Sequence, residues 1–107
     1  MAGWSFLTNH GLALTYIGRY PDSTGLEIAR AVGITERATR TIIADLLGSG
    51  YIQQEKVGRR NRYWINTTLP LRLLGERAVP VGALLDLLWQ GEHLPTRSQP
   101  QPLAWPG

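Results

Sequence analysis

The residues best suited to bind a charged ligand gather in one part of the chain. The window from Thr35 to Arg62 holds six basic residues against three acids, and the other residues hold equal numbers of each, so this window accounts for the net charge of +3. Ten of the eleven basic residues are arginines. Their guanidinium groups form paired hydrogen bonds with phosphate and with guanine. The pattern predicts binding of a polyanion; an ordinary solvated charged surface is the alternative.

Residues that could carry catalysis are missing from the pattern. The chain has no cysteine, which excludes thiol catalysis, disulfides and cysteine-ligated metal. Its two histidines, His10 and His93, have no neighbouring ligands in the sequence, and no glycine-rich phosphate loop is present. We therefore expect no enzyme, no metal and no cofactor.

Length and hydropathy place the chain in a broad class. With 107 residues it corresponds to about one domain. It contains no apolar run long enough to span a membrane, and its first residues lack the basic start and apolar stretch of a signal peptide. We expect a cytoplasmic domain with a mainly α fold and a small β-hairpin, in the α+β class.

One predicted helix, residues 36–47, must present the first arginines. Successive residues of a helix are rotated by about 100°. This rotation gathers five residues on a buried face: Ala38, Thr39, Ile42, Ile43 and Leu46. The opposite face carries Arg37, Arg40, Thr41 and Ala44. A basic face with one small residue can approach a nucleic-acid groove closely.

Two shorter helices are predicted ahead of it. Apolar residues at steps of three and four indicate a helix over 9–20, with Asn9 as its N-cap. A second helix follows the turn-forming residues 22–25 and ends at Gly33, where a left-handed residue is needed. Thr35 then caps the basic helix. The order helix, short turn, helix predicts a helix-turn-helix unit.

A β-hairpin is predicted directly after the basic helix. Residues 51–57 and 62–66 have strand composition, and the glycine-containing residues 58–61 form a basic turn between them. One of Tyr63 and Trp64 should pack on the core. A further apolar helix is expected over residues 80–89, preceded by a short helix or extended arm at 69–74.

Three linked stretches resemble a known group: residues 26–46 with their helix-turn-helix pattern, Gly50-Tyr51-Ile52, and the basic tip 58–63. Together they are similar to bacterial winged helix-turn-helix transcriptional regulators of the MarR/ArsR type. The resemblance covers roughly residues 8–67, and the flanking segments are shorter than is usual in MarR proteins.

The resemblance implies sequence-specific binding of double-stranded DNA. Helix 36–47 would enter the major groove, and the wing 56–63 would meet the backbone or the minor groove. The residues expected to bind DNA are Thr35, Arg37, Arg40, Thr41, Lys56, Arg59, Arg60, Asn61 and Arg62. A winged-helix module that binds a protein partner is the alternative.

Residues 1–90 are expected to form the winged helix-turn-helix domain with flanking helices and a C-terminal helical extension, and residues 91–107 a flexible tail rich in Pro, Gln and Ser. We expect a homodimer, because one winged helix contacts few base pairs. Its predicted interface is the apolar face formed by Val81, Leu84, Leu85, Leu88 and Trp89. One further hypothesis is that a small-molecule effector binds in an apolar cleft near Trp4, Tyr16 and Tyr20. The alternative is that these side chains only pack in the core.

Overall fold

The computed structural model describes residues 4–72 and 79–90, which form four helices and one two-stranded antiparallel sheet. The expected α+β class is confirmed. In chain order the elements are α1 (Asn9–Arg19), α2 (Gly25–Val32), α3 (Glu36–Gly48), β1 (Ile52–Val57), β2 (Arg60–Ile65) and α4 (Val81–Gln90).

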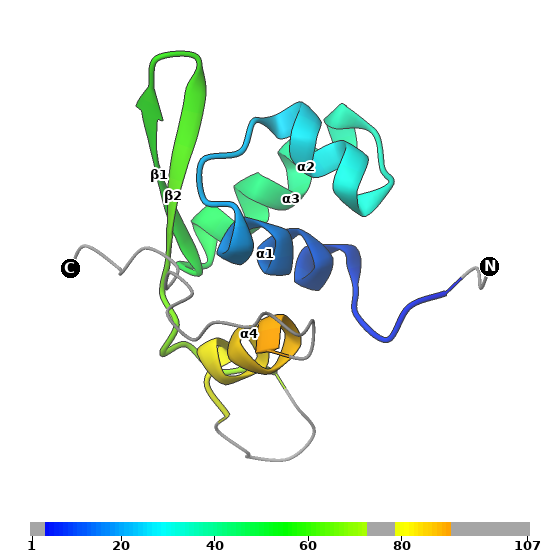
Figure 1. Ribbon diagram of the computed structural model, residues 1–107, viewed down its shortest axis with the longest axis vertical. Helices are drawn as coiled ribbons and strands as arrows, with labels where there is room; N and C mark the ends of the chain where they lie inside the picture. The colour runs from blue at the N-terminus through cyan, green and yellow to red at the C-terminus, as the bar shows by residue number, and fades with distance from the viewer. Residues whose placement is uncertain (1–3, 73–78, 91–107) are drawn as a thin grey trace.

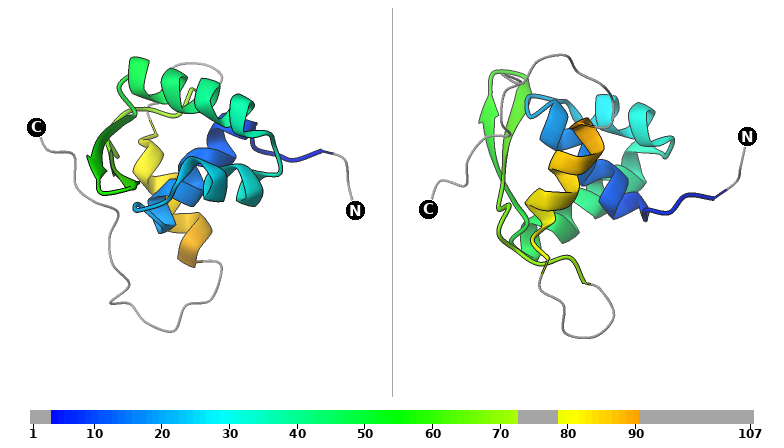
Figure 2. Two further views of the ribbon diagram at one scale, coloured as in Figure 1. Left: turned by 90° about the horizontal axis from the view of Figure 1, so that it is seen from above. Right: turned by 60° about the horizontal axis from the view of Figure 1, so that its bottom comes forward.

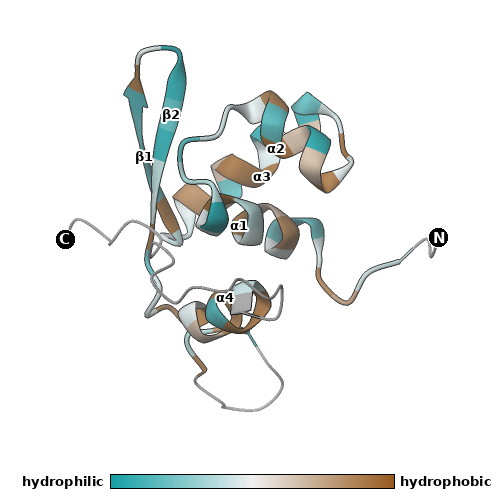
Figure 3. Cartoon of the chain, in the orientation of Figure 1, coloured by the Kyte–Doolittle hydropathy of each residue, from teal (hydrophilic) through white to brown (hydrophobic). Residues whose placement is uncertain are grey.

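Helices α1, α2 and α3 pack on one another, and α4 lies against α1 below them in the view of Figure 1. The β1–β2 hairpin follows α3 and projects past the helices. Its outer part is mainly hydrophilic, as the teal of Figure 3 shows, and five of the six residues of β1 are exposed. The hairpin therefore reaches into solvent from a base that is held by the helices.

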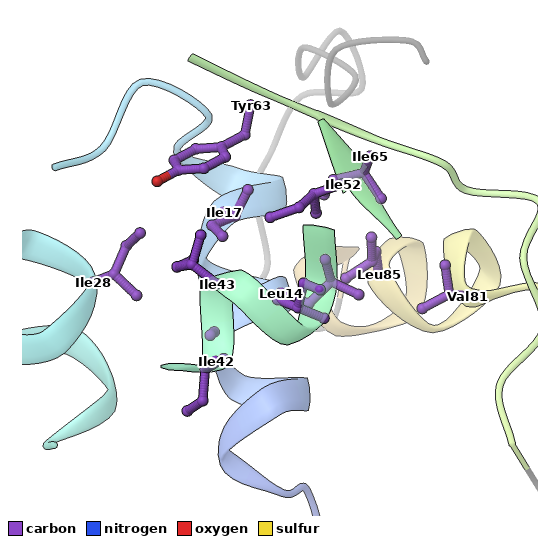
Figure 4. Packing of buried hydrophobic residues seen from close by; sticks show 12 residues of the cluster. Leu14, Ile17, Ile28, Ile42, Ile43, Ile52, Tyr63, Ile65, Val81 and Leu85 are labelled. Carbon is purple, nitrogen blue, oxygen red and sulfur yellow. The ribbon is translucent and has the colours of Figure 1, made fainter. Parts of the chain in front are cut away.

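Every described element contributes to one hydrophobic core (Figure 4). Ile17 of α1 and Ile28 of α2 are fully buried, and Tyr63 of β2 covers them from the hairpin side. The expected face of α3 is confirmed, because Thr39, Ile42, Ile43 and Leu46 are buried, with Ala38 half-buried. Of the two wing aromatics, Tyr63 is the one in the core.

Side-chain caps fix the helix ends. The expected N-cap of α1, Asn9, is wrong: Thr8 has the extended cap conformation, and its hydroxyl accepts a hydrogen bond from Gly11 N at 3.1 Å. Helix α1 ends at Arg19, with Tyr20 as its C-cap. Gly33 ends α2 at φ +86°, a conformation that costs glycine little. Thr35 caps α3 as predicted.

The hairpin turn is tighter than its composition indicated. Val57 pairs with Arg60, so the turn contains only Gly58 and Arg59. The predictions of a turn over 58–61 and of a second strand starting at Arg62 are therefore wrong. Gly58 has φ +64°, and such a left-handed residue favours a two-residue hairpin turn.

Helix α4 is part of this core and does not present its whole apolar face outward. We expected Val81 and Leu85 in a homodimer interface, but they are only 3% and 2% exposed because they pack inside the same chain. Gly82 permits this close approach, since a Cβ there would lie 2.7 Å from Thr67 Cβ. The indole of Trp89 donates a hydrogen bond to Thr15 O at 3.0 Å. These four residues of α4 attach it to the rest of the chain.

Some expectations fall outside the described residues. Of the segment 69–74, residues 69–72 lead away from the hairpin, and Pro70 forms an isolated bridge with Pro80. Residues 73–78, His93 and the expected tail 91–107 lie outside the described ranges.

Truncating Leu85 should test whether α4 belongs to the cooperative core. Leu85→Ala leaves a cavity beside α1, so we expect the free energy of unfolding to fall by about 2–5 kcal/mol in urea titrations. Leu87→Ala is the matched control: Leu87 is 65% exposed, and its truncation should change that free energy by less than about 0.5 kcal/mol. Equally small effects for both variants would show that α4 unfolds apart from the core.

Candidate nucleic-acid interface

The outer face of α3 carries a compact set of polar and basic groups. Arg37, Arg40, Thr41 and Ala44 are all exposed, opposite the buried stripe. Arg37 and Arg40 are three residues apart and so lie on neighbouring turns of one helix face. Within the described ranges, neither guanidinium forms a hydrogen bond or ion pair with the protein. Both side chains are therefore available to an external acceptor.

The start of α3 adds a second element to this surface. Thr35 is exposed, and its hydroxyl accepts a hydrogen bond from Ala38 N at 3.0 Å. The same hydroxyl still has a proton to donate. The first amides of a helix and its dipole favour a nearby anion. The arginines lie within the first two turns, so helix end and side chains present positive charge in the same direction.

The basic residues of the hairpin do not form one cluster. Arg59 lies at the exposed turn. Lys56 and Asn61 are paired across the strands and therefore share one face of the hairpin. Side chains alternate along a strand, so Arg60 and Arg62 project from the other face. Five hairpin residues were predicted to bind DNA. Among them, only Arg59 and Lys56 carry a charge that forms no ion pair with a described residue.

Arg60 connects the hairpin to the start of α2. Its guanidinium donates to both carboxylate oxygens of Glu27, at 2.9 and 3.1 Å, and to Asp22 O at 2.7 Å. Glu27 Oε1 also accepts from Thr24 N at 2.9 Å, which completes a capping box on α2. The hydrogen bond from Arg60, followed by that from Thr24, lowers the pKa of Glu27 to about 2. We call this set the Glu27 latch.

Arg62 forms a similar but looser contact. Its Nε donates to Asp22 Oδ1 at 3.0 Å, and both side chains are about half exposed. The backbone adds a fixed point close by, because Tyr63 N donates to Pro21 O at 2.9 Å. Strand β2 is thus joined to the loop between α1 and α2 at three residues, Arg60, Arg62 and Tyr63. Arg60 and Arg62, predicted to bind DNA, are occupied within the chain.

Sequence reasoning missed the acidic partners of this latch. A threonine followed three residues later by glutamate is the signature of a capping box, and Thr24 with Glu27 fits it. That signal could have identified Glu27 as a helix-start residue. Its partner Arg60 is 33 residues away, and no local pattern indicates such a pairing.

A second missed contact joins α1 to the far half of α3. His10 Nε2 and Asp45 Oδ2 lie 2.7 Å apart on the protein surface. His10 belongs to the first turn of α1, as expected. This contact pairs Asp45, the one acidic residue in the second half of α3. The other acidic residue of the helix, Glu36, lies in its first turn, where a negative charge interacts favourably with the helix dipole.

The aromatic residues expected to line an effector cleft lie in two separate groups. Tyr16, Tyr20 and Trp89 lie together, with ring centroids 4.9 and 6.4 Å apart along the series. Arg19 stacks over two of these rings, at 5.6 and 5.8 Å from their centroids. Trp4 is not part of this group and contacts Phe6 instead. The structure therefore brings together only part of the expected set.

The described residues offer neither a metal site nor a membrane span. Over the ranges 4–72 and 79–90, no three or more His, Asp or Glu side chains gather in a way that could hold a metal ion. In the same ranges, no helix combines the length and hydropathy needed to cross a membrane.

The Glu27 latch predicts a specific loss of stability in acid. The carboxyl has a pKa of about 2 in the folded chain against an ordinary 4.5, so its ionised form stabilises the fold above pH 4.5. That contribution is lost as the pH falls from 4.5 towards 2, because the unfolded chain takes up the proton first. Glu27→Gln keeps a capping-box side chain but removes the charge. We expect a lower melting temperature at pH 7 and a smaller further drop between pH 4.5 and 2.

Thermal melts from pH 2 to pH 7 measure this difference. Asp86→Asn, an exposed carboxylate on α4, is the control and should follow the pH dependence of the unmodified chain. If Glu27→Gln followed that same pH dependence, the latch would contribute nothing to the acid sensitivity.

The chain is also compared with known proteins. No known protein family matches it, and no curated protein matches it either. Its function must therefore be argued from the geometry of the α3 surface and the hairpin beside it.

Proposed function

We propose that this chain is a sequence-specific double-stranded DNA-binding protein of the winged helix-turn-helix type, acting as a transcriptional regulator and not as an enzyme. The observation that carries the proposal is the exposed face of α3, where two arginines that no described residue pairs, a threonine and an alanine lie opposite a buried stripe. In this reading α2 and α3 are the helix-turn-helix, and the β1–β2 hairpin is the wing.

The dimensions of α3 suit the major groove. Its 13 residues give a length of about 20 Å at 1.5 Å per residue, and the groove is about 12 Å wide and admits one helix. Arg37 and Arg40 would reach guanine edges or phosphates. Ala44 leaves room for the helix to approach the groove floor, and Thr35 with the first amides of α3 would hold a phosphate.

The hairpin has a more restricted part in this proposal than its sequence indicated. Arg59 at the turn and Lys56 behind it would contact the DNA backbone or the adjacent minor groove. Arg60 and Arg62 would set the direction of the hairpin through Glu27 and Asp22. Asn61 donates to the Tyr63 hydroxyl at 3.3 Å and so supports the wing from inside.

The proposal includes a homodimer on a two-fold symmetric site, because a single winged helix discriminates few base pairs. Val81 and Leu85 are buried within the chain. The interface therefore has to use other apolar groups.

Replacing one arginine separates base recognition from phosphate binding. If Arg40 contacts a base edge, Arg40→Ala should weaken binding to the specific duplex by about 1–3 kcal/mol and leave non-specific duplexes nearly unchanged. Titrations of labelled duplexes selected from a genomic library measure both. Arg30→Ala, an exposed arginine of α2 outside the α3 face, is the control. An equal loss on every duplex would assign Arg40 to the backbone.

The wing should appear in the salt dependence of binding. Each phosphate contact contributes about 0.9 to the slope of log affinity against log salt. The double variant Lys56→Ala, Arg59→Ala should therefore reduce the magnitude of that slope by the contribution of up to two phosphate contacts. Arg30→Ala should leave the slope unchanged. An unchanged slope would remove the wing from the DNA interface. Absence of binding to any duplex at low salt would favour the protein-interaction module.

A further inference from the structure

Two aromatic residues ahead of α1 are exposed. Trp4 is 68% exposed and Phe6 is 92% exposed. Their rings meet edge to face, with centroids 4.9 Å apart, so they form one apolar surface. The segment from Trp4 to Thr8, which we call the aromatic arm, runs away from the body of the chain (Figures 1 and 2). Adjacent exposed aromatics of this kind mark a contact surface.

The same chain carries an apolar groove of about 300 Å³ between α1, the end of α3 and the start of α4. Its walls are mostly aliphatic: Leu14, Leu46, Leu71, Val81, Leu84 and Leu85. The His10–Asp45 pair lies at its edge. An apolar hollow of this size has room for ring-shaped groups. Within the described ranges, the groove and the arm are complementary in chemistry.

Their relative position favours exchange between two copies. The arm joins α1 at Thr8, and the groove begins two and three residues later at His10 and Gly11. Two copies placed groove to groove about a two-fold axis would bring the root of each arm beside the groove of the other. The arm runs away from the helices (Figures 1 and 2), and so it can reach a second copy.

We propose that two copies of this chain exchange their aromatic arms, so that the Trp4–Phe6 pair of each fills the groove of the other. An aromatic side chain buries about 150–250 Å². The four rings of two exchanged arms would together remove on the order of 800 Å² of aromatic surface from water. The inference rests on the homodimer in the proposed function and makes no use of DNA binding.

Cross-linking tests the contact directly, because the chain has no cysteine of its own. A chain with Ser5→Cys keeps both arm aromatics, and a second, tagged chain carries Leu84→Cys in the groove. Mixed and oxidised, they should form a disulfide-linked pair. Ser5→Cys mixed with Leu87→Cys is the control, since Leu87 is exposed on α4 and is not part of the groove wall. Equal yields from both mixtures would overturn the exchange.

The mass in solution tests whether the aromatic arms hold the dimer together. Sedimentation of the full chain at micromolar concentration should give twice the 11.9 kDa of one copy. The double variant Trp4→Ser, Phe6→Ser should give the mass of one copy with an unchanged melting transition, because both residues are exposed. Leu87→Ser should remain a dimer. A single-copy mass for the unmodified chain, as with an arm folded into its own groove, or a dimer of the arm variant, would overturn the proposal.

DNA titrations of the same proteins keep the two proposals apart. Specific DNA binding by a single-copy protein would contradict the arm exchange and the homodimer, and would leave the DNA-binding function standing. An arm-dependent dimer that binds no duplex would contradict the DNA-binding function alone.

Discussion

The carboxylate of Glu27 holds together the two parts of the molecule that the proposed interface needs. One of its oxygens completes the capping box at the start of α2, and both receive the guanidinium of Arg60 from the hairpin. A two-stranded hairpin is only marginally stable by itself, and most of β1 is exposed. The direction of the hairpin relative to α2 and α3 therefore depends on a small number of contacts along β2. Those contacts are polar on one face of β2 and apolar, through Tyr63, on the other.

Because the hairpin is held by ion pairs to Glu27 and Asp22, neighbouring arginines have different environments. Arg37, Arg40 and Arg59 project where no described side chain meets them, whereas Arg60 and Arg62 neutralise Glu27 and Asp22. The positive field of the surface is thus supplied by fewer residues than the sequence contains. It is also better defined, since Glu27 and Asp22 are paired with the hairpin arginines and Asp45 is paired with His10. A site that binds a polyanion gains from this arrangement because repulsion from nearby acids is reduced.

Most features set by local sequence were predicted well, apart from the N-cap of α1 and the capping box of α2, whereas features set by distant contacts were not. The faces of α3, the left-handed Gly33 and the Thr35 cap all follow from spacing over a few residues. The bounds of the hairpin turn depended on Arg60 joining β2, which is fixed in part by a partner 33 residues away. The excess of apolar residues in α4 was correctly recognised, but the surface on which they pack was not predicted. Gly82 allows the helix to pack closely inside the chain, and no periodicity shows which neighbour will cover an apolar face.

The two-residue turn of the hairpin lies outside all of the contacts that fix β2 to the helices. Gly58 and Arg59 are exposed, and the last tie before them is Arg60. The entropy cost of a longer loop rises slowly, by about 0.6 kcal/mol for each doubling of its length. Residues inserted between Val57 and Arg60 would therefore extend the reach of the hairpin with little penalty to folding. Evolution can vary the tip of this hairpin, in length and in charge, while the scaffold that aims it stays the same.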